Sequence, residues 1–188
     1  KASNVASDFG NKFGRPLICG SVLTFEHEGK TGEPTYGFDK VIMLAGGVGY
    51  ARRSDAQKGT PEPGEEVVLL GGDNYRIGMG GGAVSSVNTG QYAGAIELNA
   101  VQRSNPEMQK RVENVIRTLS ESEDNPIISI HDHGAGGHLN CLSELVETTG
   151  GHFDLSAFPI GAETLSSKEI IGNESQERMG LMVKGDAV

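Results

Sequence analysis

The stretch of residues 131–138, HDHGAGGH, combines a carboxylate, three imidazoles and a glycine-rich turn. Asp132 comes two residues after the end of the apolar run 127–130 (IISI), which predicts a buried strand. In layered α/β structures, ligands gather beyond the carboxyl ends of strands. A lone carboxylate in this place suits Mg²⁺, because this ion prefers oxygen ligands and takes water and substrate phosphates for its remaining positions. The sequence therefore predicts Asp132 as a magnesium ligand.

Two other interpretations of this stretch stay open. Asp132 can instead cap the following turn, since an aspartate side chain accepts hydrogen bonds from the first N–H groups of a helix. The imidazoles can instead hold zinc, which takes nitrogen and sulfur ligands in a tetrahedral arrangement. The zinc site would use the three histidines and one further ligand: His131, His133 and His138, with Cys141 or His152.

A second stretch, residues 71–86 (GGDNYRIGMGGGAVSS), follows the short apolar run 67–70. Its glycines let backbone N–H groups approach an anion, and the serine hydroxyls and Arg76 add donors. It matches neither a P-loop, for want of Gly-Lys-Ser/Thr, nor a dinucleotide fingerprint. The stretch therefore either contacts a phosphate or only forms a tight turn. The phosphate-contact candidates are Gly80, Gly81, Gly82, Ser85 and Ser86.

The polar run 173–181 (NESQERMGL) offers side chains for a polar substrate. Glu174, Ser175 and Gln176 supply an acceptor, a hydroxyl and an amide, a set that recognises substrate hydroxyls and amides. Taken alone the run is also typical of an ordinary loop. We expect its Glu177 and Arg178 to form a surface ion pair.

The run 101–108 (VQRSNPEM) places Gln102 and Arg103 just before a predicted helix start. An arginine in this place can bind a phosphate, because its guanidinium presents several donors in one plane. Without further information, a solvated helix entry is the favoured interpretation of the run.

The elements that must position these residues alternate between strands and helices without a regular repeat. Apolar residues at helical spacing after Asn105-Pro106 predict an amphipathic helix that ends before Asn125-Pro126, and a second helix is predicted over residues 139–146. We expect an α+β fold in which a mixed β-sheet is layered with helices. The predicted strands are residues 16–25, 40–44, 67–70, 127–130, 153–155 and 178–183.

Composition excludes several classes of protein. The 188 residues carry a net charge of −9, which argues against binding to nucleic acid or an anionic membrane surface. No run approaches the roughly 18 apolar residues of a membrane span. Two cysteines, Cys19 and Cys141, cannot build a disulfide scaffold and favour a reducing cytoplasmic location. The 28 glycines form no repeat and are assigned to turns.

Taken in this order, the motifs resemble those of one enzyme family. Over nearly the whole chain, six motifs are similar to those of the large, single-chain form of phosphoribosylformylglycinamidine synthase. They are NKFGRPLICG, IMLAGGVG, GMGGGAVSS, VQRSNPEM, HDHGAGGHLN and NESQERMGL. That family converts formylglycinamide ribonucleotide, ATP and glutamine into the amidine. Its synthetase part belongs to the aminoimidazole ribonucleotide synthetase-like superfamily, which is built from duplicated A and B domains.

The resemblance implies roles for individual residues. It assigns Asp132 as a Mg²⁺ ligand, and Gln102, Glu174, Ser175 and Gln176 as substrate contacts. It implies that residues 1–60 form the tail of an A-type domain with its connector. Residues 61–188 would form a B-type (C-terminal-like) domain that is truncated at its end. It assigns nothing to His133 or His138.

The resemblance also implies that most ATP-binding residues, the catalytic histidine and the glutaminase cysteine lie in other domains of a longer chain. The chain begins without methionine and ends just after an apolar run, so we expect a fragment that is inactive alone. Its partners would be formylglycinamide ribonucleotide and the remaining synthetase and glutaminase domains. Two alternatives stay open: a non-catalytic scaffold domain of the same enzyme, and an independent zinc protein.

Overall fold

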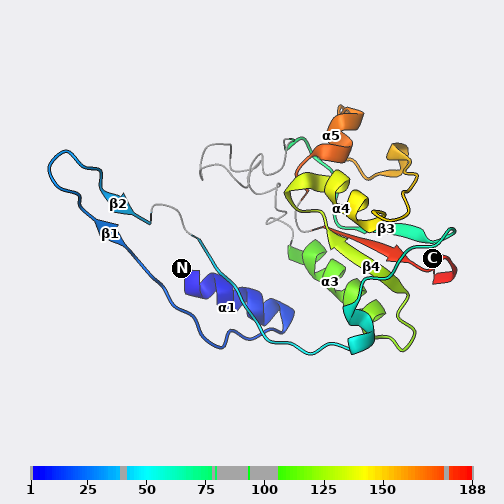
Figure 1. Ribbon diagram of the computed structural model, residues 1–188, viewed down its shortest axis with the longest axis horizontal. Helices are drawn as coiled ribbons and strands as arrows, with labels where there is room; N and C mark the ends of the chain where they lie inside the picture. The colour runs from blue at the N-terminus through cyan, green and yellow to red at the C-terminus, as the bar shows by residue number, and fades with distance from the viewer. Residues whose placement is uncertain are drawn as a thin grey trace. The chain divides into compact units, whose positions relative to one another are not determined.

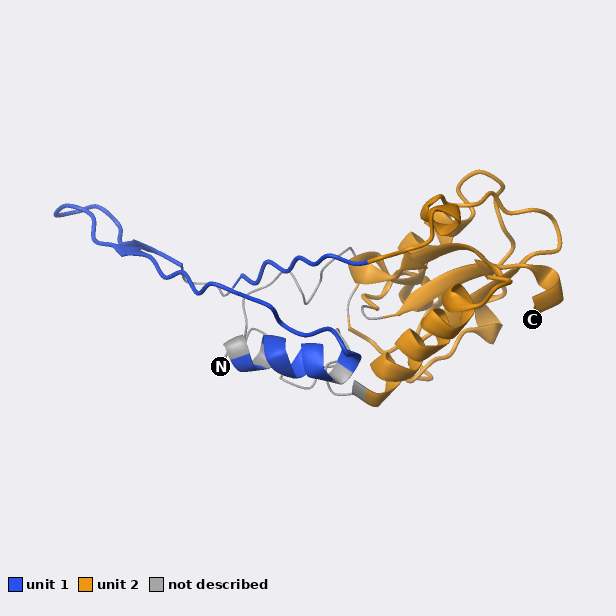
Figure 2. Ribbon diagram, turned by 90° about the horizontal axis from the view of Figure 1, so that it is seen from below, with its two compact units in different colours: residues 1–49 blue, residues 50–188 orange. Residues whose placement is uncertain are grey.

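The computed structural model describes residues 2–38, 42–77, 79, 93, 106–175 and 178–187. The chain divides into two compact units, residues 1–49 and residues 50–188 (Figure 2). Each unit is described by itself below. None of the helices within the described ranges has both the length and the apolar character that crossing a bilayer requires.

Unit 1 contains one helix and one small hairpin. Helix α1 spans Ala2–Phe13, and strands β1 (Glu26–His27) and β2 (Tyr36–Gly37) pair antiparallel. The rings of Phe25 and Phe38, which flank the hairpin, lie 5.6 Å apart. The hairpin therefore closes around the glycine-containing loop of residues 28–35.

The two buried strands predicted in unit 1 are not formed. Residues 16–25 and 42–44 have no strand pairing, and Ile18 and Leu44 are each 92% exposed. Residues 40 and 41 lie outside the described residues. The prediction was wrong because an apolar, β-branched pattern indicates a strand only where a partner strand and a packing face are present. Within the described part of unit 1, neither is available.

Unit 2 is built on a three-stranded sheet of order β3-β5-β4, with β3 at Glu66–Leu70, β5 at Met179–Val183 and β4 at Ile127–Asp132 (Figure 1). Both pairings are antiparallel, and β4 has an irregularity between Ile127 and Ser129. The strands predicted at residues 67–70, 127–130 and 178–183 are thus confirmed to within two residues at either end. The described sheet is antiparallel rather than mixed.

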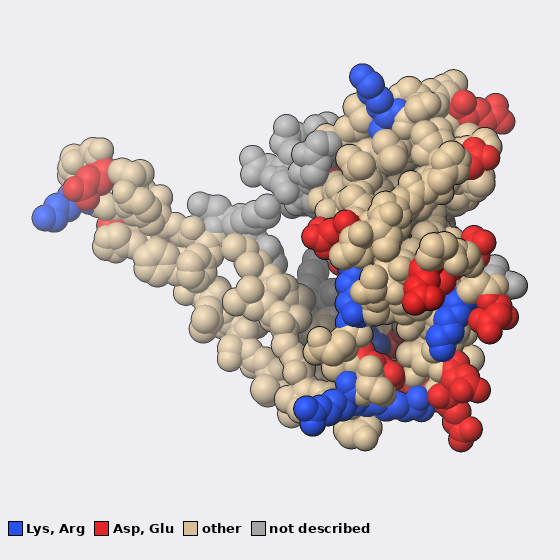
Figure 3. Space-filling view, turned by 45° about the vertical axis from the view of Figure 1, so that its right-hand side comes forward, with Lys and Arg blue, Asp and Glu red and all other residues tan. Residues whose placement is uncertain are grey.

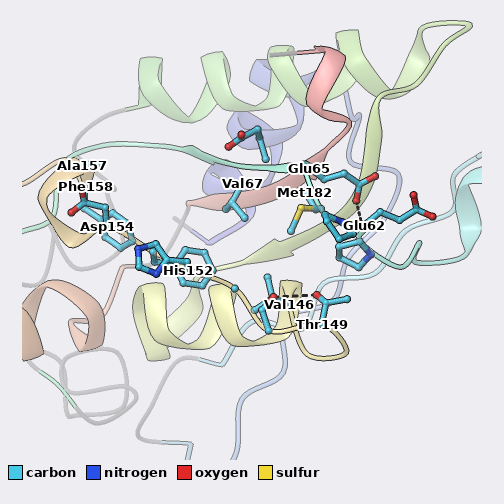
Figure 4. Close-up of a pocket in the computed structure, with 17 residues that line it drawn as sticks. Glu62, Glu65, Val67, Val146, Thr149, His152, Asp154, Ala157, Phe158 and Met182 are labelled. Atoms are coloured by element: carbon cyan, nitrogen blue, oxygen red, sulfur yellow. Dashed lines mark hydrogen bonds between the residues drawn. The ribbon is translucent and has the colours of Figure 1, made fainter.

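Helices cover both faces of this sheet. Helix α3 (Pro106–Glu121) and helix α4 (Gly137–Leu145) lie on opposite faces, and the short α5 (Ser167–Gly172) packs against α4 (Figures 1 and 4). The α+β class and both predicted helices are confirmed. Four 3₁₀ turns complete the described elements: η1 (Arg53–Ala56), η2 (Gly134–Gly136), η3 (Leu155–Ala157) and η4 (Gly185–Ala187).

The short strand predicted at residues 153–155 is replaced by the turn η3. The Asp154 carboxylate accepts hydrogen bonds from the backbone N–H and the hydroxyl of Ser156, at 2.9 and 2.7 Å. Capping of this kind competes with strand pairing, because the aspartate satisfies backbone donors locally. A local side-chain contact thus overrides the apolar pattern.

The connector residues 50–60 belong to unit 2 and hold the ends of its helices. The Arg52 guanidinium donates to the carbonyls of Glu121 and Ser122, at 2.8 and 2.7 Å, at the C-terminal end of α3. The Lys58 ammonium donates to the carbonyl of Glu144 in the last turn of α4. Cations in these places satisfy terminal carbonyls and oppose the negative end of the helix dipole.

The face of unit 2 that Figure 3 presents carries both basic and acidic side chains, with acidic groups spread over it and a band of basic side chains along its lower edge.

The core of unit 2 depends on a close approach between β5 and α4. Cys141, Leu145 and Met182 form the buried cluster, with Val67 and Ile128 packed against it. Gly180 lies directly beneath α4: a Cβ atom there would come within 2.4 Å of the Cys141 Sγ and 2.9 Å of the Leu145 Cδ1. A glycine is therefore required for the helix to reach the sheet.

We predict that Gly180→Ala lowers the free energy of unfolding by about 1–3 kcal/mol, the usual cost of overpacking a core. Urea unfolding followed by circular dichroism measures the loss. Gly172→Ala is the matched control, because a Cβ there meets only ordinary contacts with Met79 at 3.8 Å or more. Equal losses in the two variants would contradict the close approach.

Candidate functional site

The sheet brings three of the singled-out stretches to one edge. Leu70 and Asp132, the last residues of β3 and β4, both pair with Met179, the first residue of β5. The glycine-rich stretch leaves the sheet at this edge, the HDHGAGGH stretch continues from it, and the NESQER stretch enters it. The chain therefore gathers its chemistry-bearing residues at one end of unit 2.

Asp132 presents its side chain to solvent at this edge. Gly134 follows in the left-handed region at φ +54°, and a Cβ there would lie 3.0 Å from the Asp132 Oδ1. The glycine thus leaves open the space beside the carboxylate. No side-chain cap is present on η2 or α4, so the capping interpretation of Asp132 is wrong.

The zinc interpretation also fails on geometry. His133 Nε2 and His138 Nδ1 face each other at 2.9 Å, so these two rings bond to one another. The Cys141 thiol donates to the carbonyl of His131, and burial raises the pKa of this thiol to about 12. Among the described residues, no three histidine, cysteine or acidic side chains converge on one point.

The NESQER stretch packs directly against the HDHGAGGH turn. Gly137 has φ +63°, and a Cβ there would lie 2.0 Å from the carbonyl oxygen of Asn173. The backbone N–H of Ser175 donates to the carbonyl of Gly134 at 3.3 Å, and that of His133 donates to the carbonyl of Arg178 at 3.0 Å. The two stretches predicted to act together are therefore in contact.

Glu174 and Ser175 lie inside this contact, with exposed fractions of 2% and 1%. The Ser175 hydroxyl donates to the carbonyl of Asn173 at 3.1 Å. Two further polar side chains support the same region: Asn74, which is fully buried, donates to the carbonyl of Ile170, and Asn173 donates to Asn74 at 3.5 Å. Nothing in the sequence pattern singles out Asn74, because its role depends on residues about 100 positions away.

Several predicted site residues lie outside the described residues, and the structure says nothing of them. These are the substrate-contact candidates Gln102 and Gln176, and the phosphate-contact candidates Gly80, Gly81, Gly82, Ser85 and Ser86.

Two arginines have roles that differ from those expected. Arg76 donates to the Glu169 carboxylate at 2.7 Å and to the carbonyl of Thr164 at 2.6 Å. It therefore stabilises the position of α5, and its guanidinium is already engaged and is not an open donor for a phosphate. Its hydrogen bond lowers the pKa of Glu169 to about 2. Arg178 is buried rather than on the surface: it donates to the carbonyl of Asp73, and desolvation lowers its pKa to about 10. Its expected ion-pair partner, Glu177, lies outside the described residues.

The His133–His138 pair is buried and neutral. Desolvation lowers the pKa of His133 to about 4 and that of His138 to about 3. The charge of Arg178 adds to the lowering of the His138 pKa, whereas the backbone hydrogen bond with Arg178 opposes the lowering of the His133 pKa. The ring of His138 also packs against Phe158, 4.8 Å between centroids. The pair therefore fills the space behind Asp132 without carrying charge at neutral pH.

Comparison with known proteins agrees with this fold and motif set. The family model for the C-terminal domain of AIR synthase related protein matches residues 62–188. The chain therefore belongs to the AIR synthase related proteins. This membership and the relatives below confirm the resemblance inferred from the motifs.

Two curated relatives are similar over almost the whole chain. A probable chloroplastic/mitochondrial phosphoribosylformylglycinamidine synthase of Arabidopsis thaliana is 44% identical over 99% of the chain, and the human phosphoribosylformylglycinamidine synthase is 43% identical over 98%. The chain spans only 13% and 14% of the lengths of these two proteins. It corresponds to a small part of each.

Solved structures share the fold. The T. maritima PurL structure in complex with FGAR has a TM-score of 0.60 at 22% identity, covering 96% of this chain and 28% of that one. The structure of the same protein with ATP has a TM-score of 0.57 at 20% identity, covering 97% of this chain and 26% of that one. At this identity the likeness concerns the fold alone.

We predict that acid destabilises unit 2 through the buried histidines. In the unfolded chain these histidines bind protons as the pH falls below about 6.5, whereas in the folded chain they stay neutral until the pH approaches 4. Stability that is present at neutral pH is therefore lost as the pH falls toward 4. Between about pH 6.5 and pH 5, each such histidine contributes a loss of about 2 kcal/mol.

The free energy of unfolding should therefore fall by about 2 kcal/mol less between about pH 6.5 and pH 5 in His138→Gln than in wild type, whatever the effect of the substitution at neutral pH. Urea unfolding at a series of pH values gives the slopes. His152→Gln, which alters an exposed histidine of the same unit, should keep the wild-type slope. A His138→Gln slope equal to that of wild type would contradict the neutral, buried pair.

Proposed function

We propose that the chain is a part of a phosphoribosylformylglycinamidine synthase. Such an enzyme is an ATP- and glutamine-dependent ligase of purine biosynthesis that converts formylglycinamide ribonucleotide into formylglycinamidine ribonucleotide. The observation that carries the proposal is the 43–44% identity to two proteins of that name over 98–99% of the chain. The T. maritima structures with FGAR and ATP add support through their shared fold.

Within that enzyme, residues 61–188 act as a B-type domain, and residues 1–60 act as the tail of an A-type domain with its connector. The family match over residues 62–188 supports the first part. The exposed apolar side chains of unit 1 support the second, since a surface of that kind is ordinarily covered by a neighbouring domain. They include Leu17, Ile18, Val22, Leu23, Ile42, Met43 and Leu44.

Asp132 is the magnesium ligand of this domain. Its carboxylate is a hard oxygen donor, it is exposed at the sheet edge, and Gly134 keeps the space beside it open. A bound Mg²⁺ would neutralise charge on transferring phosphate oxygens. The chain's own contribution is to hold the Asp132 backbone in β4 and so fix the direction of the carboxylate.

The remaining candidates orient substrate. Gln102, Glu174, Ser175 and Gln176 would contact the ribonucleotide, and the Gly80–Gly82 turn with Ser85 and Ser86 would contact a phosphate. The contact of residues 173–175 with the HDHGAGGH turn supports a common site for Asp132 and this set.

The chemistry follows from the substrate. An amide oxygen is a poor leaving group, so ATP first phosphorylates it, and ammonia released from glutamine then displaces phosphate. The step depends on positioning and charge stabilisation rather than on a protein nucleophile. The catalytic histidine, the glutaminase cysteine and most ATP contacts would lie outside residues 1–188, so the chain alone is expected to be inactive. A cytoplasmic location also stays a prediction.

A specific observation favours a second candidate function, a non-catalytic scaffold domain of the same enzyme. Glu174 and Ser175 are almost completely buried, as they would be if they only held the two stretches together. In a scaffold, Gln102→Ala and Gln176→Ala would leave the Michaelis constants of the full-length enzyme unchanged. Raised Michaelis constants for formylglycinamide ribonucleotide would exclude it.

In the full-length enzyme, we predict that Asp132→Asn lowers synthetase activity by about tenfold or more, because one charged metal ligand is lost. Phosphate release that depends on formylglycinamide ribonucleotide, ATP and glutamine, measured across a Mg²⁺ titration, gives the rate and the metal dependence. The Mg²⁺ requirement should rise while the melting temperature stays close to that of wild type.

Asp124→Asn is the matched control, because Asp124 is an exposed aspartate near the opposite end of β4. It should keep wild-type activity and Mg²⁺ dependence. If Asp132→Asn also stays within about twofold of wild type, less than the loss of a charged contact produces, the metal assignment is wrong.

A further inference from the structure

Unit 2 carries an open groove of about 770 Å³ at the end of the sheet opposite to Asp132 (Figure 4). Glu66 and Val67, at the start of β3, line it together with Met182 near the end of β5. Asp132 pairs at the other end of the same strands. The groove is therefore separate from the candidate site and is used by none of the roles proposed above.

The groove joins an apolar floor to an acidic rim. Its floor consists of Val67, Val146 and Met182, which belong to or pack on the core cluster. Two aromatic side chains, an imidazole and three carboxylates also line it, and none of the lining residues is a lysine or arginine: Phe153, Phe158, His152, Glu62, Glu65 and Asp154. Glu66 lies at the groove too, but as the neighbour of Val67 on β3 it directs its side chain to the opposite face of the sheet. The chemistry of the lining is that of a site for a group both apolar and cationic.

Two of these carboxylates are held in fixed positions. One oxygen of Glu65 accepts a hydrogen bond from the backbone N–H of Glu62 at 2.6 Å. One oxygen of Asp154 accepts two hydrogen bonds from Ser156, which lower its pKa. The second oxygen of each carboxylate stays available to a cation. Because these side chains are already held in place, they lose little further conformational entropy when a cation binds.

No lysine or arginine of the described residues pairs with the rim carboxylates, although the His152 imidazole lies beside Asp154 and interacts favourably with its charge. Among the ion pairs formed by the described residues, none involves Glu62, Glu65, Glu66 or Asp154. Uncompensated carboxylates around an apolar floor repel acidic chains and attract basic ones. Charge complementarity therefore selects a basic occupant.

We propose that this groove is the docking site for a basic segment with an apolar side chain, supplied by the same polypeptide from outside residues 1–188. The chain spans only 13–14% of its curated relatives, so most of such a polypeptide lies outside it. Docking places the apolar side chain on the floor and lysine or arginine side chains against the rim. The inference needs the longer polypeptide but not the activity proposed for it.

The test is carboxyl labelling of the full-length enzyme with glycine ethyl ester and carbodiimide, read by mass spectrometry. The groove carboxylates Glu62 and Asp154 are exposed in unit 2, as is the control Glu123, which lies away from the groove. If the segment is docked in about nine-tenths of molecules, the groove carboxylates react about tenfold more slowly than Glu123. Carbodiimide without added amine should join them to a lysine outside residues 1–188.

A paired variant tests the role of charge. Glu65→Lys with Asp154→Lys should restore labelling of Glu62 toward the rate of Glu123, and raised salt should do the same in wild type. The matched control, Asp124→Lys with Glu163→Lys, makes the same charge change at exposed residues elsewhere, keeps Glu123 as the reference and should leave Glu62 protected.

Three results would overturn the proposal. The first is that the groove carboxylates of wild type label as fast as Glu123. The second is that the cross-linked lysine belongs to a second copy or to another protein. The third is that the covering segment carries no basic residue. Because labelling does not require turnover, a failure here is distinguishable from a failure of the proposed function.

Discussion

Unit 2 depends on the central position of β5. This strand pairs with both β3 and β4, so three segments more than 45 residues apart in sequence share one register. The pairing requires a glycine at position 180, because α4 approaches the strand more closely than any side chain would allow. Once β5 is in place, the ends of β3 and β4 and the start of β5 meet at one edge.

That edge and its opposite differ in chemistry for a physical reason. At the Asp132 end, tight turns at Gly134 and Gly137 let two polar stretches pack together, which buries neutral histidines and leaves one carboxylate exposed. At the other end, the loop after α4 stands away from the start of β3 and leaves a groove. One sheet thus supports a compact polar site and an open acidic groove at separate ends.

The two units also differ in how far they satisfy their own apolar residues. Unit 2 buries Cys141, Leu145 and Met182 between sheet and helix, whereas Ile18 and Leu44 of unit 1 stay almost fully exposed. Burial of apolar area is the main favourable contribution to folding, at about 25 cal/mol per Å². The described part of unit 1 obtains little of it. This difference is what a domain tail covered by a neighbour would show.

Local pattern alone determined β3, β4, β5, α3 and α4 of unit 2, but not α5 or the turn η3. The Asn-Pro start and apolar spacing of α3, the apolar runs of β3, β4 and β5, and the place of Asp132 after a strand all follow from short-range periodicity and capping. Tertiary structure alone decided that residues 16–25 form no strand, that His133 bonds to His138, and that Arg178 is buried. These outcomes depend on partners distant in sequence, and periodicity carries no information about which partner is present.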